Sequence, residues 1–249
     1  MRRLVRSVGV AALSLAVLAG CGAAQDDQAD RPKTARAFPR PDRPVSQVGQ
    51  TAFSTEVQRD SVNEAQTVMD LADIRENMTV ADIGAGEGYY TVRLAMRVGK
   101  KGRVLAQDID AAALHRLGER VERERFDNVS IKPGAADDPR LPHASFDRVF
   151  LVHMYHEVIE PYAFLWRLRP SLRPGARVIV VDTDRATDQH GIPPSLLFCE
   201  FNAVGFRLTQ FIRKPEMQGY YAQFEAVGDR PAPEAIKPCR QADKPAAAR

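Results

Sequence analysis

The chain has 249 residues, which is room for one α/β domain of ordinary size with its tails. Hydrophobic residues make up 44%, enough for a sizeable core, and this excludes a wholly disordered chain. The formal net charge is +3, and Arg2, Arg3 and Arg6 account for all of it. The rest of the chain has no basic surplus, so its composition gives no indication of nucleic-acid binding.

The first twenty residues have the pattern of a signal peptide. A positive start precedes an apolar run over residues 8–18, which is about half the roughly 20 residues that a membrane-spanning helix needs. The Leu-Ala-Gly-Cys sequence at 18–21 then resembles the lipobox of bacterial lipoproteins. This resemblance implies a signal peptide over 1–20, lipid on Cys21 and a membrane-anchored protein of the bacterial cell envelope, periplasmic or outward-facing. A plain secretory signal with an incidental cysteine is the alternative.

Two segments flank the expected domain. Residues 21–50 have only scattered apolar positions, which predicts a flexible tether, and the proline-rich residues 229–249 predict a C-terminal tail. One domain is therefore expected over 51–228. In an oxidising compartment Cys199 and Cys239 are candidates for a disulfide between domain and tail; the alternative is a buried thiol at Cys199 and a free one in the tail.

Between these ends, strand-like and helix-like segments alternate. Apolar spacing predicts helices over 60–72, 89–98, 111–125 (with Asp110 as N-cap) and 160–169, and strands over 79–83, 103–106, 129–131, 146–152 and 178–181. Such alternation predicts a parallel sheet with helices on both sides. After a helix over 195–204, the strands 206–212 and 220–227 have no helix between them, so they should pair antiparallel.

Three glycines, Gly84, Gly86 and Gly88, stand between the first strand and the helix that follows it. Glycines let the backbone turn sharply and approach a ligand that side chains would exclude. In open parallel sheets, ligands bind outside the carboxyl ends of the strands. The glycines alone fit a dinucleotide site, or a tight turn without a ligand.

Acidic residues stand near the ends of neighbouring strands. Asp82 comes two residues before the first glycine, where a carboxylate can meet a cationic amino group. Asp108 ends the second strand and is followed by Ile109; an acid at this position can accept both hydroxyls of a ribose. Asp137 precedes a Leu-Pro loop and the strand that begins near residue 146.

Together with the closing hairpin, these motifs resemble the class I S-adenosylmethionine-dependent methyltransferases over residues 60–227. The resemblance implies an α/β fold with a seven-stranded Rossmann-like sheet, mostly parallel with a C-terminal antiparallel hairpin, and helices on both faces. In this family an acid before a Leu-Pro loop reaches the adenine amino group, which indicates Asp137, with Asp138 as the alternative. Segments 80–91 and 153–157 look like those of a bacterial group of predicted secreted methyltransferases. The implied cofactor is S-adenosylmethionine, with the binding residues Asp82, Gly84, Gly86, Gly88, Asp108, Ile109, Asp137 and His153.

A polar cluster follows the fourth strand, and His190 follows the fifth, at the same expected edge of the sheet. Histidines from separate loops can bind a substrate or remove its proton, because imidazole titrates near neutrality. We predict His156 as the base and His190, Tyr155 and Glu157 as substrate contacts. Hydrogen-bonded loop anchors are the alternative for both histidines. A metal site of His153, His156 and Glu157 is disfavoured, because cysteine ligands are absent and methyl transfer needs no metal.

The sequence therefore predicts a methyltransferase acting on a small molecule or a cell-envelope component. Its methyl donor is made in the cytoplasm, whereas a lipoprotein faces outward. The alternative is thus a non-catalytic lipoprotein that binds or senses an adenosyl ligand. The presence of the glycines with Asp82 and Asp108 favours the enzyme, and the terminal hairpin disfavours a nicotinamide-dependent oxidoreductase.

Overall fold

The computed structural model describes residues 28–46 and 55–241. The chain divides after Arg31 into two units, and the account below concerns the second, from Pro32 onward. The predicted signal peptide and the lipid attachment at Cys21 lie outside the described residues. No helix in the described part of the chain has the length and apolar character needed to cross a membrane.

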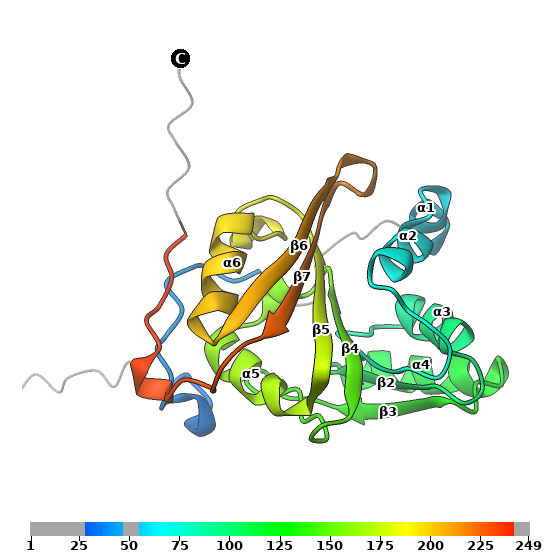
Figure 1. Cartoon of the computed structure of the whole chain (residues 1–249), viewed down its shortest axis with the longest axis horizontal. Coiled ribbons are helices and arrows are strands. Elements are labelled where there is room, and N and C mark those ends of the chain that lie inside the picture. Colours follow the sequence, from blue (N-terminus) through cyan, green and yellow to red (C-terminus); the bar gives the residue numbers. More distant parts are fainter. Residues whose placement is uncertain (1–27, 47–54, 242–249) are drawn as a thin grey trace, which may run out of the picture. The chain divides into compact units, whose positions relative to one another are not determined.

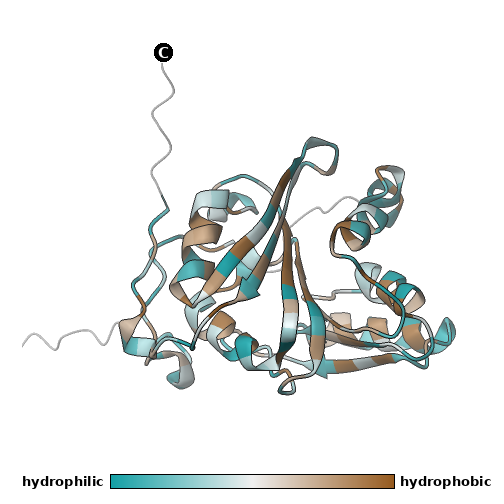
Figure 2. Cartoon of the chain, in the orientation of Figure 1, coloured by the Kyte–Doolittle hydropathy of each residue, from teal (hydrophilic) through white to brown (hydrophobic). Residues whose placement is uncertain are grey.

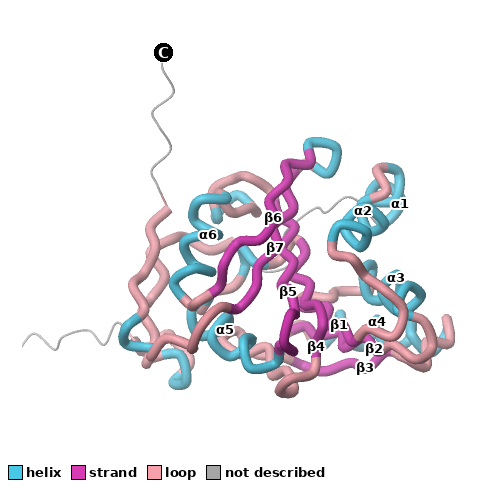
Figure 3. Tube along the Cα trace, in the orientation of Figure 1, coloured by secondary structure: helices cyan, strands magenta, loops and turns pink. Residues whose placement is uncertain are grey.

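Seven strands form one sheet in the order β3-β2-β1-β4-β5-β7-β6 (Figure 1 and Figure 3). The neighbours among the first five strands are parallel, and β7 is antiparallel to both β5 and β6. The predicted fold class and the closing hairpin are therefore confirmed. The strands are β1 (Thr79–Ile83), β2 (Arg103–Asp108), β3 (Val129–Pro133), β4 (Phe146–Val152), β5 (Leu172–Asp182), β6 (Phe206–Lys214) and β7 (Gly219–Ala226).

Six α-helices accompany the sheet in the described part of the chain. The predicted N-cap of α4 is confirmed, because the Asp110 side chain accepts a hydrogen bond from the Ala112 amide at 2.8 Å. The single helix expected over 60–72 is two helices, because Asn63 adopts a left-handed conformation with φ 51°. The helices are α1 (Glu56–Ser61), α2 (Glu64–Leu71), α3 (Tyr89–Val98), α4 (Ala111–Arg123), α5 (Pro161–Leu168) and α6 (Pro194–Ala203).

The two faces of the sheet bury alternate residues of the same strands, as the period of two requires. In β1, Val80 belongs to the core that packs on α2 and α3, whereas Ala81 and Ile83 belong to the core that packs on α5 and α6. Figure 2 shows the resulting hydrophobic runs, in brown, along the central strands. With both faces covered, only the strand ends are left to form a site.

The N-terminal and C-terminal segments are packed against the domain. The flexible tether predicted over 21–50 is wrong for residues 32–46, because Phe38 is buried and the Arg43 side chain forms a salt bridge with Glu200 in which neither side chain is exposed. The tail is also packed as far as residue 241: Cys239 is buried and joined to Cys199 by a disulfide, with 6.0 Å between the two Cα atoms. A few inserted side chains, too sparse to be seen in the composition, hold both segments.

Candidate functional site

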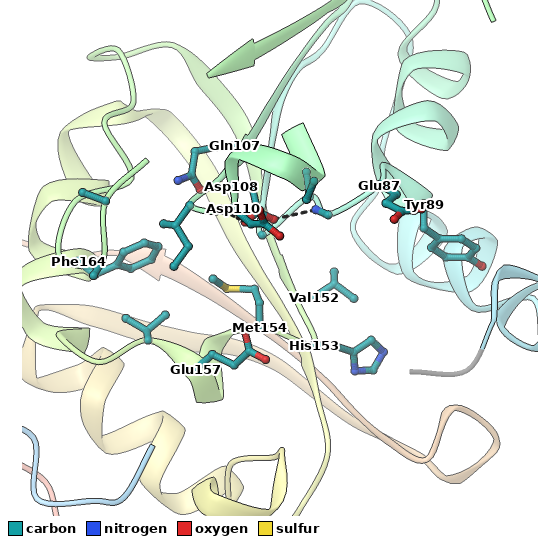
Figure 4. Close-up of a pocket in the computed structure, with 18 of the residues that line it drawn as sticks. Glu87, Tyr89, Gln107, Asp108, Asp110, Val152, His153, Met154, Glu157 and Phe164 are labelled. Atoms are coloured by element: carbon teal, nitrogen blue, oxygen red, sulfur yellow. Dashed lines mark hydrogen bonds between the residues drawn. The ribbon is translucent and has the colours of Figure 1, made fainter. Parts of the chain in front are cut away.

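A cavity of about 630 Å³ lies at the carboxyl ends of β1, β2 and β4 (Figure 4). This volume is in the range of small-molecule sites, and the position is the one expected for a parallel sheet. Its walls come from the glycine loop, from the loops after β2, β3 and β4, and from α1. The lining includes Glu56, Arg59, Gly84, Gly86, Gln107, Asp108, Ile109, Ala135, Ala136, His153, Met154, Glu157, Val158, Ile159 and Phe164.

The three predicted glycines have different roles. Gly84 has φ +68°, and a Cβ there would lie 2.7 Å from Met154 Cγ, so only glycine allows this side chain so close. Gly86 has φ +53° and lines the cavity, and a Cβ there would have no atom within 4 Å. Gly88 does not line the cavity; a Cβ there would lie 2.4 Å from Leu117 Cδ1, so this glycine allows α3 to begin against α4. Gly86 thus keeps the cavity open, and Gly88 is structural.

Asp108 is fixed in the cavity wall at the end of β2. Its Oδ2 accepts a hydrogen bond from the Gly86 amide at 2.8 Å, and its Oδ1 accepts one from the Asp110 amide at 2.9 Å (Figure 4). Each carboxylate oxygen has a further lone pair for an incoming hydroxyl. Beside it, Ile109 lines the cavity with 51% of its surface exposed. Asp108 and Ile109, neighbours in the chain, therefore give the cavity a polar anchor and an apolar contact side by side.

Asp82 lies beneath the glycine loop and does not line the cavity. Its side chain is buried, and its Oδ2 accepts a hydrogen bond from Thr91 Oγ1 at 2.6 Å. Burial raises the pKa of this carboxyl group to about 6. The sequence predicts direct contact between Asp82 and a ligand, and this arrangement does not provide it. Asp82 instead links β1 to α3 through its hydrogen bond with Thr91.

The adenine contact predicted at Asp137 also needs correction. Its carboxylate is buried and accepts hydrogen bonds from Arg167 Nη1 at 2.7 Å and from Thr34 Oγ1 at 2.6 Å. The alternative, Asp138, accepts a hydrogen bond from the Arg140 amide at 2.7 Å. Neither acid lines the cavity. The physical reason is a tight turn that leaves the small side chains of the loop at the cavity, namely Ala135 and Ala136.

Gln107 is a cavity residue that the sequence reasoning missed. It is 1% exposed and lines the cavity next to Asp108. Its side-chain amide packs on Gly134, where a Cβ would lie 1.3 Å from Nε2. A carboxamide both donates and accepts hydrogen bonds, which suits the edge of a heterocyclic base. A polar residue at a buried strand end, together with this glycine, was the available signal.

His153 lines the cavity, as predicted, and its imidazole pairs with an acid from α2. The Nε2 atom lies 3.3 Å from Glu64 Oε1, and Arg59 Nε donates to the same oxygen at 3.1 Å. Burial opposes ionisation of Glu64, but the hydrogen bonds and positive charges of His153 and Arg59 prevail and lower its pKa to about 2. The Arg59 guanidinium also lies 3.8 Å from the centre of the Tyr89 ring. Helix α1, which the sequence reasoning did not assign to the site, therefore lines one wall, and Glu64 of α2 pairs with the lining residues Arg59 and His153.

Of the four predicted catalytic residues, only Glu157 lines the cavity. Tyr155 as a substrate contact is wrong: it is completely buried, and its hydroxyl donates to Glu200 Oε2 at 2.9 Å. His156 is 1% exposed and does not line the cavity, which removes the geometric basis for its predicted role as a base. The structure does bring His156 and His190 together from two loops, with ring centroids 5.8 Å apart.

Comparison with known proteins bears on this arrangement. Residues 80–175 match the family described as a methyltransferase domain. A protein-L-isoaspartate O-methyltransferase of Methanothrix thermoacetophila is 31% identical over 45% of this chain and 50% of its own length. The UbiE C-methyltransferase of ubiquinone and menaquinone biosynthesis from Methylococcus capsulatus is 26% identical over 68% of this chain and 67% of its own. The chain thus spans half to two thirds of these relatives.

Two solved structures share the fold. An S-adenosylmethionine-dependent methyltransferase from Aquifex aeolicus has a TM-score of 0.63 and 22% identity, over 68% of this chain and 93% of that one. The cyclase SpnF has a TM-score of 0.59 and 13% identity, over 77% of this chain and 89% of that one. Residues 80–175 thus resemble a methyltransferase domain, and the described chain has the fold of the class I methyltransferases. S-adenosylmethionine is the cofactor of this family, and the open space at Gly86 with the Asp108 carboxylate fits its ribose part.

Proposed function

We propose that this protein transfers a methyl group from S-adenosylmethionine to a small-molecule or cell-envelope acceptor. The observation that carries the proposal is Asp108, whose carboxylate is held in the cavity wall by the amides of Gly86 and Asp110. A carboxylate fixed in this way accepts the two hydroxyls of a ribose without reorganising.

The chain's own residues bind and orient the reactants. The donor supplies an electrophilic methyl group on a sulfonium. Asp108 holds the ribose, Ile109 covers the base, and the Gln107 carboxamide meets its polar edge. The cavity aligns donor and acceptor, and alignment of this kind can lower the barrier by about 7–11 kcal/mol.

The far side of the cavity indicates what kind of acceptor fits. Val158, Ile159 and Phe164 form an apolar surface, and Glu157 adds a carboxylate beside it. We infer an acceptor with an apolar body and one polar group. Glu157 is retained as its contact, because it is the only one of the four predicted catalytic residues that lines the cavity.

We further propose that lipid on Cys21 anchors the protein at the cell envelope, which the lipobox-like sequence at 18–21 supports. Incorporation of radiolabelled lipid into the protein, and the loss of this label in Cys21→Ser, tests the lipid attachment. At such a location the donor is scarce. A second candidate function is therefore non-catalytic binding of an adenosyl ligand, which the burial of His156 and Tyr155 away from the cavity favours.

Calorimetry of the full chain with S-adenosylmethionine and its demethylated product tests the proposal. Asp108→Ala and Gly86→Arg should abolish binding, whereas Glu119→Gln, an exposed acid on α4, should leave it unchanged. A folded protein that binds neither compound at millimolar concentration would refute the cofactor assignment. Binding without turnover on envelope extracts would favour the non-catalytic function.

A further inference from the structure

We propose that His156, Glu157 and His190 bind a divalent transition-metal ion of the zinc type. One donor atom from each of these three residues lies within 4.8 Å of the other two. The histidines come from different loops, one after β4 and one after β5. This metal site does not depend on the proposed methyl transfer.

The strongest evidence is a pair of buried imidazole nitrogens without hydrogen-bond partners. Among the buried side-chain nitrogen and oxygen atoms of the described chain, two nitrogens have no hydrogen-bond partner. They are His156 Nε2 and His190 Nδ1. Nearly all buried polar groups in proteins are paired, so two orphans on adjacent rings indicate a missing ligand. The rings stand almost perpendicular, with an angle of 87° between their planes.

The hydrogen bond between His156 and Asp182 orients the imidazole for a metal ligand. Its Nδ1 lies 3.0 Å from both oxygens of Asp182, and the Thr183 amide donates to the same carboxylate at 2.8 Å. Because a carboxylate accepts, Nδ1 is the donor in this bond, and in the neutral imidazole Nε2 is then the nitrogen with a lone pair toward the cluster. A histidine held by a carboxylate through its other nitrogen is the usual support of a metal-binding imidazole.

The donor set and its spacing indicate the class of metal. Two histidines and one carboxylate are common zinc ligands, and they leave a fourth position for water or substrate. His156 Nε2 lies 4.0 Å from Glu157 Oε1, whereas tetrahedral zinc bonds of about 2.1 Å place neighbouring donors about 3.4 Å apart. The three donors lie up to 4.8 Å apart, so side-chain rotations that move each donor inward by less than about 1 Å would close the site.

Contacts from both ends of the chain hold the two loops. Arg43 donates to the carbonyl of His156 at 3.2 Å. Ser46 accepts a hydrogen bond from the His190 amide at 3.1 Å and donates to the carbonyl of Thr187, whose hydroxyl in turn donates to Gln241 Oε1 at 2.9 Å. Fixed backbones of this kind preorganise a metal site. Because Glu157 also lines the cavity, an ion held here borders the substrate space.

Titration of the chelator-treated full chain with Zn²⁺ by calorimetry, and with Co²⁺ by visible absorption, tests the site without any methyl donor. We expect saturation at one ion per chain. His190→Gln and Glu157→Gln should each weaken binding by at least 100-fold, and Asp182→Asn by 10- to 100-fold. His115→Gln, a histidine on α4 with 75% of its side chain exposed, is the matched control and should change nothing.

The outcomes are separable. The partly exposed Glu157 keeps its shape as glutamine, so this variant decides the result even where a histidine variant fails to fold. Lack of saturable binding overturns the proposal, as does binding that Glu157→Gln and His190→Gln leave unchanged. Since the titration uses the metal alone, a protein that fails to bind S-adenosylmethionine can still give a positive result here.

Discussion

Replacement of Arg43 by methionine tests whether the N-terminal segment belongs to the folded domain. Arg43 Nε donates to Glu200 Oε1 at 2.8 Å, and neither side chain is exposed. Its Nη1 and Nη2 donate to the carbonyls of His156 and Val158 at 3.2 and 3.1 Å. Methionine fills much of the same volume but leaves the Glu200 charge buried, with the Tyr155 hydroxyl as its remaining hydrogen-bond partner in the described chain.

The magnitude follows from the uncompensated charge. Removal of one partner of a buried ion pair costs about 3–5 kcal/mol in the free energy of unfolding. That is a large share of the roughly 5–15 kcal/mol by which a domain is stable. In a Glu200→Gln background no charge is left behind, so Arg43→Met should cost about 2 kcal/mol less there. The difference between the two costs isolates the ion pair from the lost packing.

Urea unfolding with the disulfide intact, followed by the fluorescence of the single tryptophan, measures these differences. Arg36→Met, an exposed arginine in the same segment, is the control and should change stability by less than about 0.5 kcal/mol. If Arg43→Met costs less than about 1 kcal/mol, or costs the same in both backgrounds, the reasoning from the buried pair is refuted.

Three further predictions concern two buried carboxyl groups and the disulfide. Burial raises the pKa of Asp82 from 3.8 to about 6, so the native state keeps a proton that the unfolded chain loses, and stability should fall as pH rises from about 4 to 6. Asp82→Asn should abolish this decline and gain up to about 3 kcal/mol at pH 7. Urea unfolding between pH 4 and pH 7 measures both effects. The pKa of Glu64 is lowered from 4.5 to about 2 despite burial, chiefly by His153, so stability should be lost as pH falls from about 4.5 through 2. Glu64→Gln should remove this loss of stability in urea unfolding at acid pH. A variant that loses stability with falling pH as the parent does would contradict the prediction. Cys199 and Cys239 are 40 residues apart, so replacing both by serine should cost about 4 kcal/mol in thermal unfolding, and added reductant should then affect only the parent protein.

The sheet and the donor side of the cavity could be predicted because they depend on local patterns. Alternating strands and helices specify a parallel sheet, and two successive strands without a helix specify the hairpin. The rule that ligands bind at carboxyl strand ends then places Gly86, Asp108 and Ile109 at the cavity, where the structure has them. Each step uses residues that are neighbours in the chain or in the sheet.

The direction of individual side chains could not be predicted in the same way. Tyr155 and Glu157 stand two residues apart in one short 3-10 turn, yet one is completely buried and the other lines the cavity. Asp137 likewise turns toward Arg167, which is 30 residues away in the chain. The sequence locates a loop at the right edge of the sheet, but the turn geometry and distant partners decide which of its side chains reach the ligand.

The two parts of the site therefore depend on different parts of the chain. The glycine loop and Asp108 are built from β1, β2 and the turns that follow them. The loops of His156 and His190 are held by Arg43 and Ser46, more than a hundred residues earlier, in a segment whose composition resembles a tether. A chain without residues 32–46 would keep the contacts that hold Asp108 and lose the contacts that Arg43 and Ser46 make with the two histidine loops. Because a fold alone does not determine a reaction, the chemistry of this protein has to be tested at both parts of the site.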